Sequence, residues 1–343
     1  MRQTLTLLSL LLGLMAAAQR YIGLQVATGG AADLPNTTFP MATNAAGEVY
    51  CAVPFNQPIT IGSATLNPVQ NGLDDIALVK LTPTGEVIWA KAFGGNTSDS
   101  PLRLAVDGMG QVYVSWSALN GVSYYFDETG TTTNFPNLGA PFNGFTCFSA
   151  EGLTLWHKPG VFGTPQLAAS SEEPGVFAVD QGAIRRLNAQ GDVLWQVAPQ
   201  PANTLVPLSA AVAGDKLAIG AYGANGLNVV TVDTVTAIVQ YLQAGVVFLL
   251  DTSGSALWGR PVGNNNGYPE QIRHIAIDPA GNAVYCGLDA FQGVLDFAGG
   301  TLANPNGPGH TLIPVLKFDL EGNEVWGRFA ASSGTSSLEM NAM

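Results

Sequence analysis

Short apolar segments alternate with turn sequences along most of the chain, and the pattern is clearest between residues 77 and 95. In residues 77–81, apolar positions alternate with others, which is the period of a half-buried β-strand. The turn at 82–85 places proline where φ is already fixed and Gly85 where a left-handed backbone costs little. Residues 77–95 are therefore predicted to form a β-hairpin that ends at the glycine pair Gly94 and Gly95.

A tryptophan follows the turn glycine of this hairpin by four residues, and the same spacing recurs along the chain. Five of the six tryptophans obey it, in the pairs Gly85 and Trp89, Gly152 and Trp156, Gly191 and Trp195, Gly254 and Trp258, and Gly322 and Trp326. Such self-similarity is the signature of a repeat architecture. A residue needed once in every repeat packs between repeats, so these five tryptophans are expected to be structural rather than to stack on ligands.

A second hairpin alternates with the tryptophan hairpin and ends in valine and tyrosine, as in 104–114 and 275–285. Aspartate followed within three residues by glycine is turn chemistry, and Val-Tyr is typical of strands. The two hairpins together give four antiparallel strands, which is the composition of a β-propeller blade. We therefore predict an all-β fold, a β-propeller with about five complete four-stranded blades at 40–93, 102–158, 166–198, 206–262 and 272–330, and partial blade strands at both ends.

Four blades carry inserts between their two hairpins, at about 54–74, 117–142, 223–244 and 289–312, whereas the third passes almost directly through 180–182. Residues 24–30 align with 89–95, so the mature chain is expected to open with the last strand of a blade. Ala342 lies 16 residues after Trp326, as Ala105 does after Trp89, which places Met343 inside the first strand of another blade. Because unpaired sheet edges are a liability, we expect this sequence to be the front part of a longer protein.

Composition narrows the class of protein without naming a ligand. Apolar residues make up 47% of the 343 and charged residues 11%, which indicates a folded chain, and 41 Gly and 21 Pro supply turns for an all-β fold. The chain has 25 Asp and Glu against 13 Lys and Arg, a net charge of -12, and no basic run. Nucleic acid is therefore not an expected partner.

The N-terminus has the pattern of a secretory signal peptide. Arg2 precedes an apolar run at 5–15, and three alanines at 16–18 supply the small residues of a cleavage site before Gln19. The apolar run is too short to cross a membrane comfortably, and no other stretch reaches its length. The sequence therefore predicts a signal peptide at 1–18 and an exported β-propeller domain at 19–343, with no membrane span after signal removal.

These repeats resemble the bacterial SBBP-type β-propeller repeat. The residues that carry the resemblance are Phe55, 59–66, 75–81, Trp89, Gly94 and Gly95 in the first blade, and Phe291, 295–302, 315–318 and Trp326 in the fifth. The resemblance covers nearly the whole mature chain and is weaker in the third and fourth blades. It implies an exported, often cell-surface propeller common in Bacteroidetes-like bacteria, and it carries over no catalytic residue.

The cysteines and histidines do not form a recognisable metal or redox motif. Cys51 and Cys286 occupy the same repeat position in different blades, so these thiols and that of Cys147 are expected to be buried rather than paired in a disulfide. The histidines, at 157, 274 and 310, fall in different blades without the spacing of a zinc site. No metal site and no cofactor is predicted.

The aspartates of the sequence do not form a recognisable catalytic pair either. Asp74 and Asp75 are adjacent, and neighbours on a strand point to opposite faces, whereas a glycosidase needs two carboxylates that converge. Asp107 and Asp278 are expected to cap their own turns through local hydrogen bonds. No catalytic residue is predicted.

The inserts remain the most informative place to look for a ligand, because loops on a rigid scaffold often carry function. The insert of the second blade begins with Trp116, the one tryptophan outside the repeat rule, and Tyr124 and Tyr125 follow it. These three residues are the candidate ligand-binding side chains, since exposed aromatic rings stack on sugars or anchor protein partners. The alternative is that Trp116, at the end of a strand, belongs to the core.

Three functions remain open at this stage. The first is a non-enzymatic surface binding or adhesion module for a glycan or a protein. The second is a propeller enzyme similar to quinoprotein dehydrogenases, suggested by the stretches at 251–258 and 319–326, although the sequence has no adjacent cysteine pair and few blades for that class. The third is a structural spacer for a domain beyond Met343.

Overall fold

The structure is a computed structural model that describes residues 39–69, 72–118, 124–126, 132–134, 142–159, 163–223, 229–238, 244–262, 270–278, 280, 282–290, 294–297, 300–303 and 312–332. Within these ranges every regular element is a β-strand, so the predicted all-β class is confirmed. No helix of the described part of the chain is long and apolar enough to cross a membrane. The predicted signal peptide and both predicted partial blade strands lie outside the described residues.

Five four-stranded antiparallel sheets form the body of the described structure. The first contains β1 (Met41–Thr43), β2 (Val49–Phe55), β5 (Asp75–Leu81) and β6 (Val87–Phe93), and the second β7 (Asp99–Val106), β8 (Val112–Ala118), β11 (Phe142–Phe148) and β12 (Thr154–Pro159). The third contains β13 (Gln166–Ala168), β14 (Val176–Val179), β15 (Ile184–Leu187) and β16 (Val193–Val197). The fourth contains β17 (Leu205–Ala213), β18 (Lys216–Gly223), β21 (Gly245–Asp251) and β22 (Ala256–Val262), and the fifth β23 (Glu270–Ile277), β24 (Val284–Ala290), β27 (Leu312–Phe318) and β28 (Glu324–Ser332).

The inserts of four sheets contain small two-stranded hairpins. These are β3 (Ile59–Ile61) with β4 (Ala64–Leu66), β9 (Tyr124–Phe126) with β10 (Thr132–Asn134), β19 (Val229–Val232) with β20 (Val235–Ile238), and β25 (Val294–Phe297) with β26 (Gly300–Ala303). The third sheet has no such hairpin, because Asp180 to Ala183 form a tight turn closed by a 3.0 Å backbone hydrogen bond.

Local chemistry explains why each sheet ends in the same hairpin. The turn glycine has a positive φ, between 76° and 97° in the five copies, and its N–H bonds the carbonyl three residues earlier, as Gly85 does to Thr82 at 2.9 Å. The pairing of the two strands shifts register next to the turn, for example between Lys80 and Leu81 of β5 where this strand pairs with β6. This is a turn with a glycine bulge, a geometry that residues with a side chain adopt at a cost.

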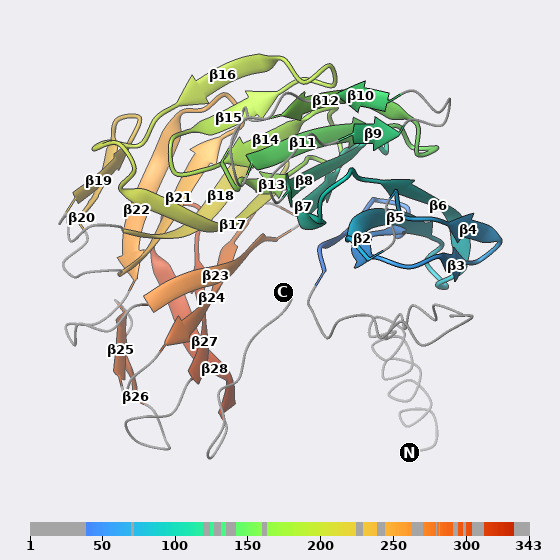
Figure 1. The fold of residues 1–343 in the computed structure, drawn as a ribbon. Helices are drawn as coiled ribbons and strands as arrows, with labels where there is room; N and C mark the ends of the chain where they lie inside the picture. The colour runs from blue at the N-terminus through green and yellow to red at the C-terminus, as the bar shows by residue number, and fades with distance from the viewer. Residues whose placement is uncertain are drawn as a thin grey trace, which may run out of the picture.

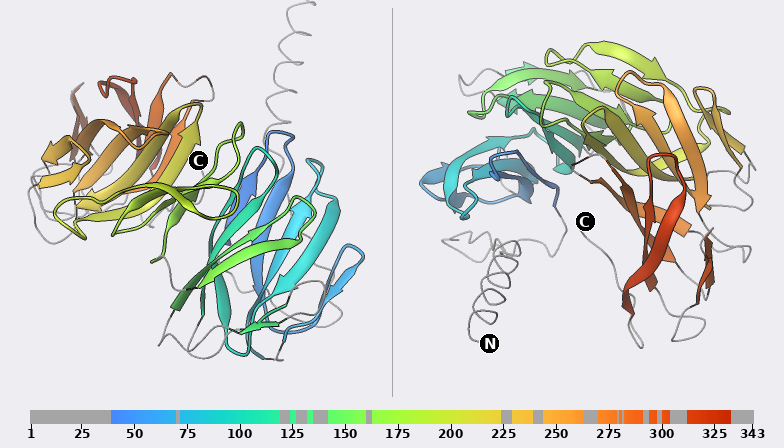
Figure 2. Two further views of the ribbon diagram at one scale, coloured as in Figure 1. Left: turned by 90° about the horizontal axis from the view of Figure 1, so that it is seen from above. Right: turned by 180° about the vertical axis from the view of Figure 1, so that it is seen from behind.

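The five sheets follow one another along an arc, from the blue first sheet to the red fifth (Figure 1), and the view from behind shows the same order (Figure 2). The first strand of each sheet contacts the first strand of the next, in the series β1, β7, β13, β17 and β23. These strands therefore lie toward the centre, and the fourth strands lie outside. Strand order and radial stacking together make the fold a β-propeller.

Apolar side chains fill the space between successive sheets. Tyr50 and Leu78 of the first sheet pack with Val114 of the second, and Val247 of the fourth packs with Leu316 of the fifth. Each sheet is covered on a face by its neighbour, so burial is shared along the arc as in other repeat proteins.

Candidate functional site

Four of the repeat tryptophans span the boundary between one sheet and the next. Each indole N–H donates to a backbone carbonyl in the outer turn of the following sheet: Trp89 to Ala150 at 3.0 Å, Trp156 to Ala189 at 2.8 Å, Trp195 to Thr252 at 3.0 Å and Trp258 to Leu320 at 2.8 Å. Trp326, on the last described strand, packs within its own sheet, 6.1 Å from the ring of Tyr285.

The turn glycines complete these junctions. A Cβ added at Gly152, Gly191, Gly254 or Gly322 would lie 2.8 to 3.2 Å from a ring atom of the tryptophan of the preceding sheet. A side chain at these positions would push the ring away. The glycine and the tryptophan of one repeat therefore belong to two different junctions. The glycine contacts the tryptophan ring of the preceding sheet, and the tryptophan contacts the outer turn of the following sheet.

Trp116 belongs to the core and not to a ligand surface. Its side chain has no exposed area, and its indole N–H donates to Thr146 Oγ1 at 3.0 Å. The ring lies against Gly144, where an added Cβ would overlap it. No ring face is available for a ligand, so the core alternative holds for Trp116. Tyr124 and Tyr125 lie on β9, and the side chains of this strand are outside the described part of the chain.

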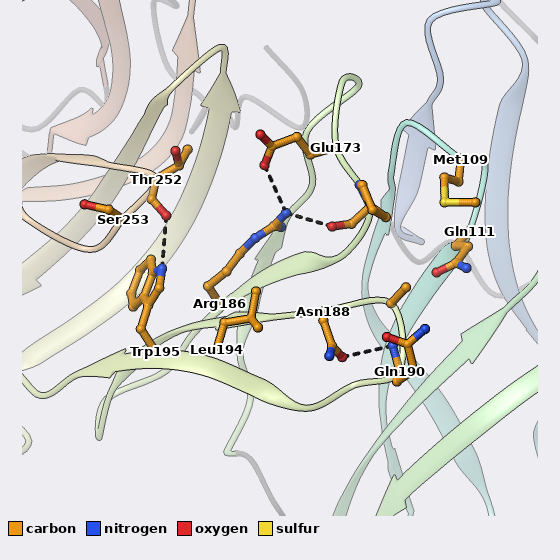
Figure 3. Close-up of a pocket in the computed structure, with 12 residues that line it drawn as sticks. Met109, Gln111, Glu173, Arg186, Asn188, Gln190, Leu194, Trp195, Thr252 and Ser253 are labelled. Atoms are coloured by element: carbon orange, nitrogen blue, oxygen red, sulfur yellow. Dashed lines mark hydrogen bonds and ion pairs between the residues drawn. The ribbon is translucent and has the colours of Figure 1, made fainter.

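A cleft of about 620 Å³ opens where short turns of the second, third and fourth sheets meet, and we name it the Arg186 cleft (Figure 3). Met109 comes from the β7–β8 turn, Arg186 and Leu194 from β15 and β16, and Thr252 from the β21–β22 turn. The side chains of Met109 and Leu194 are 63% and 61% exposed. The cleft therefore offers solvent-exposed apolar surface from two sheets.

Arg186 lies in the middle of this lining (Figure 3). Its Nη2 donates to the carbonyl of Pro174 at 2.8 Å and lies 3.7 Å from a carboxylate oxygen of Glu173, and its guanidinium stands 4.5 Å over the ring of Phe177. Burial lowers the pKa of Arg186, whereas Glu173 and other nearby acidic groups raise it. Its Nη1 is buried without a hydrogen-bond partner among the described residues. A carboxylate of a bound ligand placed beside Arg186 would be stabilised by the guanidinium, as Glu173 is.

Asp107 holds the floor of the cleft in place. As predicted, it caps its own turn, with Oδ1 accepting from the N–H groups of Met109 at 3.0 Å and Gln111 at 2.9 Å. Its Oδ2 also accepts from the N–H of Gly175 in the next sheet at 2.8 Å. This contact between sheets joins the Met109 turn to the loop that carries Glu173, so both sides of the cleft are positioned before a ligand arrives.

A second cleft, also of about 620 Å³, lies at the tight turn of the third sheet, and we name it the Asp180 cleft. Asp180 Oδ1 accepts from Gly182 and Ala183 at 2.8 Å, and its Oδ2 forms a 2.6 Å ion pair with Arg185. Asn203 and Pro207 of the loop before the fourth sheet and of β17 also line this cleft. Both carboxylate oxygens of Asp180 are therefore already paired with groups of the same turn and of β15.

The three cysteines are free and buried, on β2, β11 and β24, as the repeat positions predicted. Burial raises the pKa of Cys51 to about 12 and raises the pKa values of Cys147 and Cys286 as well. Thiols of this kind are unreactive packing groups.

Sequence reasoning did not single out Arg186, Leu194 or Met109. Leu194 carries a weak signal, because an exposed aliphatic residue precedes each repeat tryptophan, as Ile88, Leu155, Leu257 and Val325 also do. Arg186 and Met109 carry none, since they come together only when the turns of different sheets meet.

Comparison with known proteins adds little to this description. No family model and no curated protein matches the sequence. Among solved structures, the WD40 domain of Pan2 from Neurospora crassa is similar, with a TM-score of 0.40 and 10% identity over 84% of this chain and 77% of that one. An overlap this loose carries no argument about a ligand. The resemblance to SBBP repeats stays a prediction.

Proposed function

We propose that this chain is an exported, non-enzymatic β-propeller that binds a protein partner through the Arg186 cleft. The observation that carries the proposal is the pairing of exposed Met109 and Leu194 with the buried guanidinium of Arg186 in one cleft. Methionine, arginine and aromatic residues are enriched at the centres of protein interfaces, with polar groups at the rim. Asn188 and Gln190 provide such a rim.

A protein segment suits this cleft better than a glycan. Sugars stack on an open aromatic face, but the ring of Trp195 covers Gly254 and lies 5.9 Å from the ring of Phe177. An apolar side chain of a partner would contact Met109 and Leu194. A neighbouring carboxylate would take the place of Glu173, whose side chain is 68% exposed and whose ion pair with Arg186 is long, at 3.7 Å.

The test is selection of random linear peptides displayed on phage against the mature chain, followed by binding measurements on the selected peptides. Leu194→Glu should abolish binding, because it places a charge on the apolar side of the cleft. Val325→Glu is the matched control, since Val325 holds the equivalent position on β28, is 52% exposed and lies outside the cleft. Peptides that bind both variants equally, or selection of glycans alone on a parallel array, would overturn the assignment.

Export rests on the signal pattern at 1–18, together with the resemblance to exported propellers. Fusion of residues 1–30 to a phosphatase that is active only outside the cytoplasm would test it. Activity of the fusion, and its loss when Leu8 and Leu11 are replaced by Arg, are the expected results.

A further inference from the structure

Two buried carboxylates lie where the first sheet passes to the second, and neither has a full set of partners. Asp75, the first residue of β5, is 1% exposed, and Asp99, the first residue of β7, is 0% exposed. Asp75 Oδ2 accepts from the N–H of Val69 at 2.5 Å, and Asp99 Oδ2 accepts from the N–H of Gly95 at 2.7 Å. The Oδ1 atom of each is buried with no hydrogen-bond partner among the described residues.

Both carboxylates lie against the same glycine pair. Asp75 Oδ1 touches the backbone of Gly94 so closely that an added Cβ would overlap it, and Asp99 binds the next residue, Gly95. Two residues further along this loop, Thr97 Oγ1 is a third buried oxygen without a hydrogen-bond partner in the described part of the chain. Three buried oxygen atoms without a hydrogen-bond partner among the described residues therefore belong to this loop or to the strands beside it.

Within the described residues, no lysine, arginine or histidine forms an ion pair with Asp75 or Asp99. The hydrogen bonds that the two carboxylates accept come from backbone N–H groups, those of Val69 and Gly95. Two buried carboxylates without a cation are costly, and a bound ion is one of the ways in which proteins remove that cost.

We propose that Asp75, Thr97 and Asp99 form a calcium site that ties the first sheet to the second. Calcium takes about six to eight oxygen ligands in flexible geometry, from carboxylates, carbonyls and water. Within the described residues no group of three or more His, Cys, Asp or Glu is arranged to hold a metal. The remaining ligands are therefore the Thr97 hydroxyl, loop carbonyls and water, an all-oxygen set that suits calcium better than zinc or copper.

The site is independent of the Arg186 cleft, and its consequence is structural. Asp75 belongs to the first sheet and Asp99 to the second, so one ion would hold both sheets and the loop at 94–99. Asp99 N–H already donates to the carbonyl of Asp74 at 2.6 Å across this boundary. Calcium should therefore stabilise the junction of the two sheets, with little effect on peptide binding at the cleft.

The test uses the mature chain freed of metal with EGTA, with calcium chloride as the probe. Thermal unfolding and titration calorimetry should show a saturable rise in Tm and a stoichiometry near one. Asp99→Asn and Thr97→Val should weaken calcium binding by more than about tenfold, because the first removes a negative charge and a carboxylate oxygen and the second removes the hydroxyl ligand. Asp215→Asn is the matched control, since the side chain of Asp215 is 78% exposed and lies outside the loop.

Two outcomes would overturn the site. One is a wild-type chain that shows no calcium-dependent change in Tm and no binding heat. The other is a calcium effect of equal size in wild type, Asp99→Asn and Thr97→Val, which would indicate binding elsewhere. If Asp99→Asn does not fold, Thr97→Val and the wild-type calorimetry still decide the question.

Discussion

Replacement of Trp258 by alanine tests whether the repeat tryptophans hold the propeller together between its sheets. Trp258 is 5% exposed, its indole N–H bonds Leu320 of the fifth sheet at 2.8 Å, and its ring lies 5.7 Å from that of Phe318. Removal of a buried tryptophan side chain costs about 3–5 kcal/mol of unfolding free energy. The lost hydrogen bond adds about 1 kcal/mol at most, because water can reach the turn carbonyl.

Trp326→Ala is the matched control for this change. Trp326 occupies the same repeat position but is half-buried. Its ring contacts that of Tyr285, and the guanidinium of Arg328 lies 5.4 Å from it. We expect this variant to lose about 1–2 kcal/mol, since within the described part of the chain it removes packing inside one sheet. The difference of about 2–3 kcal/mol between the variants measures the contribution of one junction between sheets.

Urea unfolding followed by far-UV circular dichroism is the suitable assay, because a change in tryptophan number alters fluorescence. Repeat proteins need not unfold in two states, so midpoints should be compared with hydrogen exchange in the strands at 312–332. Trp258→Ala should lower the midpoint and speed exchange there. Equal midpoints for Trp258→Ala and Trp326→Ala would refute the reasoning, because the contact with the next sheet would then contribute nothing measurable.

Three further predictions follow from individual contacts. Burial raises the pKa of Asp99 to about 8 in the folded chain, so in EGTA the stability should fall as pH rises from about 4 to about 8. In urea titrations, Asp99→Asn should be more stable than wild type at pH 8 but not at pH 4. Gly254→Ala should lose about 2 kcal/mol or more of unfolding free energy in the same assay, because φ is 97° and the ring of Trp195 lies 3.0 Å from the new Cβ. An unchanged midpoint would contradict the proposed role of the turn glycine. Alkylation followed by mass spectrometry should find three reactive thiols in urea and almost none in the folded chain, whereas a disulfide would leave one, since Cys51, Cys147 and Cys286 are free and buried.

Much of the architecture could be read from local chemistry. The spacing of Gly85 and Trp89 is a local property, because a glycine bulge sets the register of one hairpin and the tryptophan belongs to the same hairpin. Alternation of apolar residues likewise depends only on which face of a strand is buried. Such patterns survive in a single sequence, and their repetition made the propeller predictable.

The candidate sites were much less accessible to the same reasoning. Trp116 was ambiguous because an aromatic residue at the end of a strand can face solvent or core, and only Gly144 on the neighbouring strand decides that it is buried. Asp75 could be recognised as the start of a strand, but its partner Asp99 lies in another sheet. No spacing rule connects two residues that meet across a boundary between sheets.

The sequence by itself therefore determined the strands, the turns and their grouping into repeated four-stranded sheets, because hydrogen bonds and side-chain alternation within a hairpin are short-range. Only the tertiary structure decided that Arg186, Leu194 and Met109 share a cleft and that Asp75 and Asp99 lie against the same glycine pair, Gly94 and Gly95. These groupings depend on how one sheet is placed against the next. That placement results from packing summed over whole sheet faces, which no local pattern encodes.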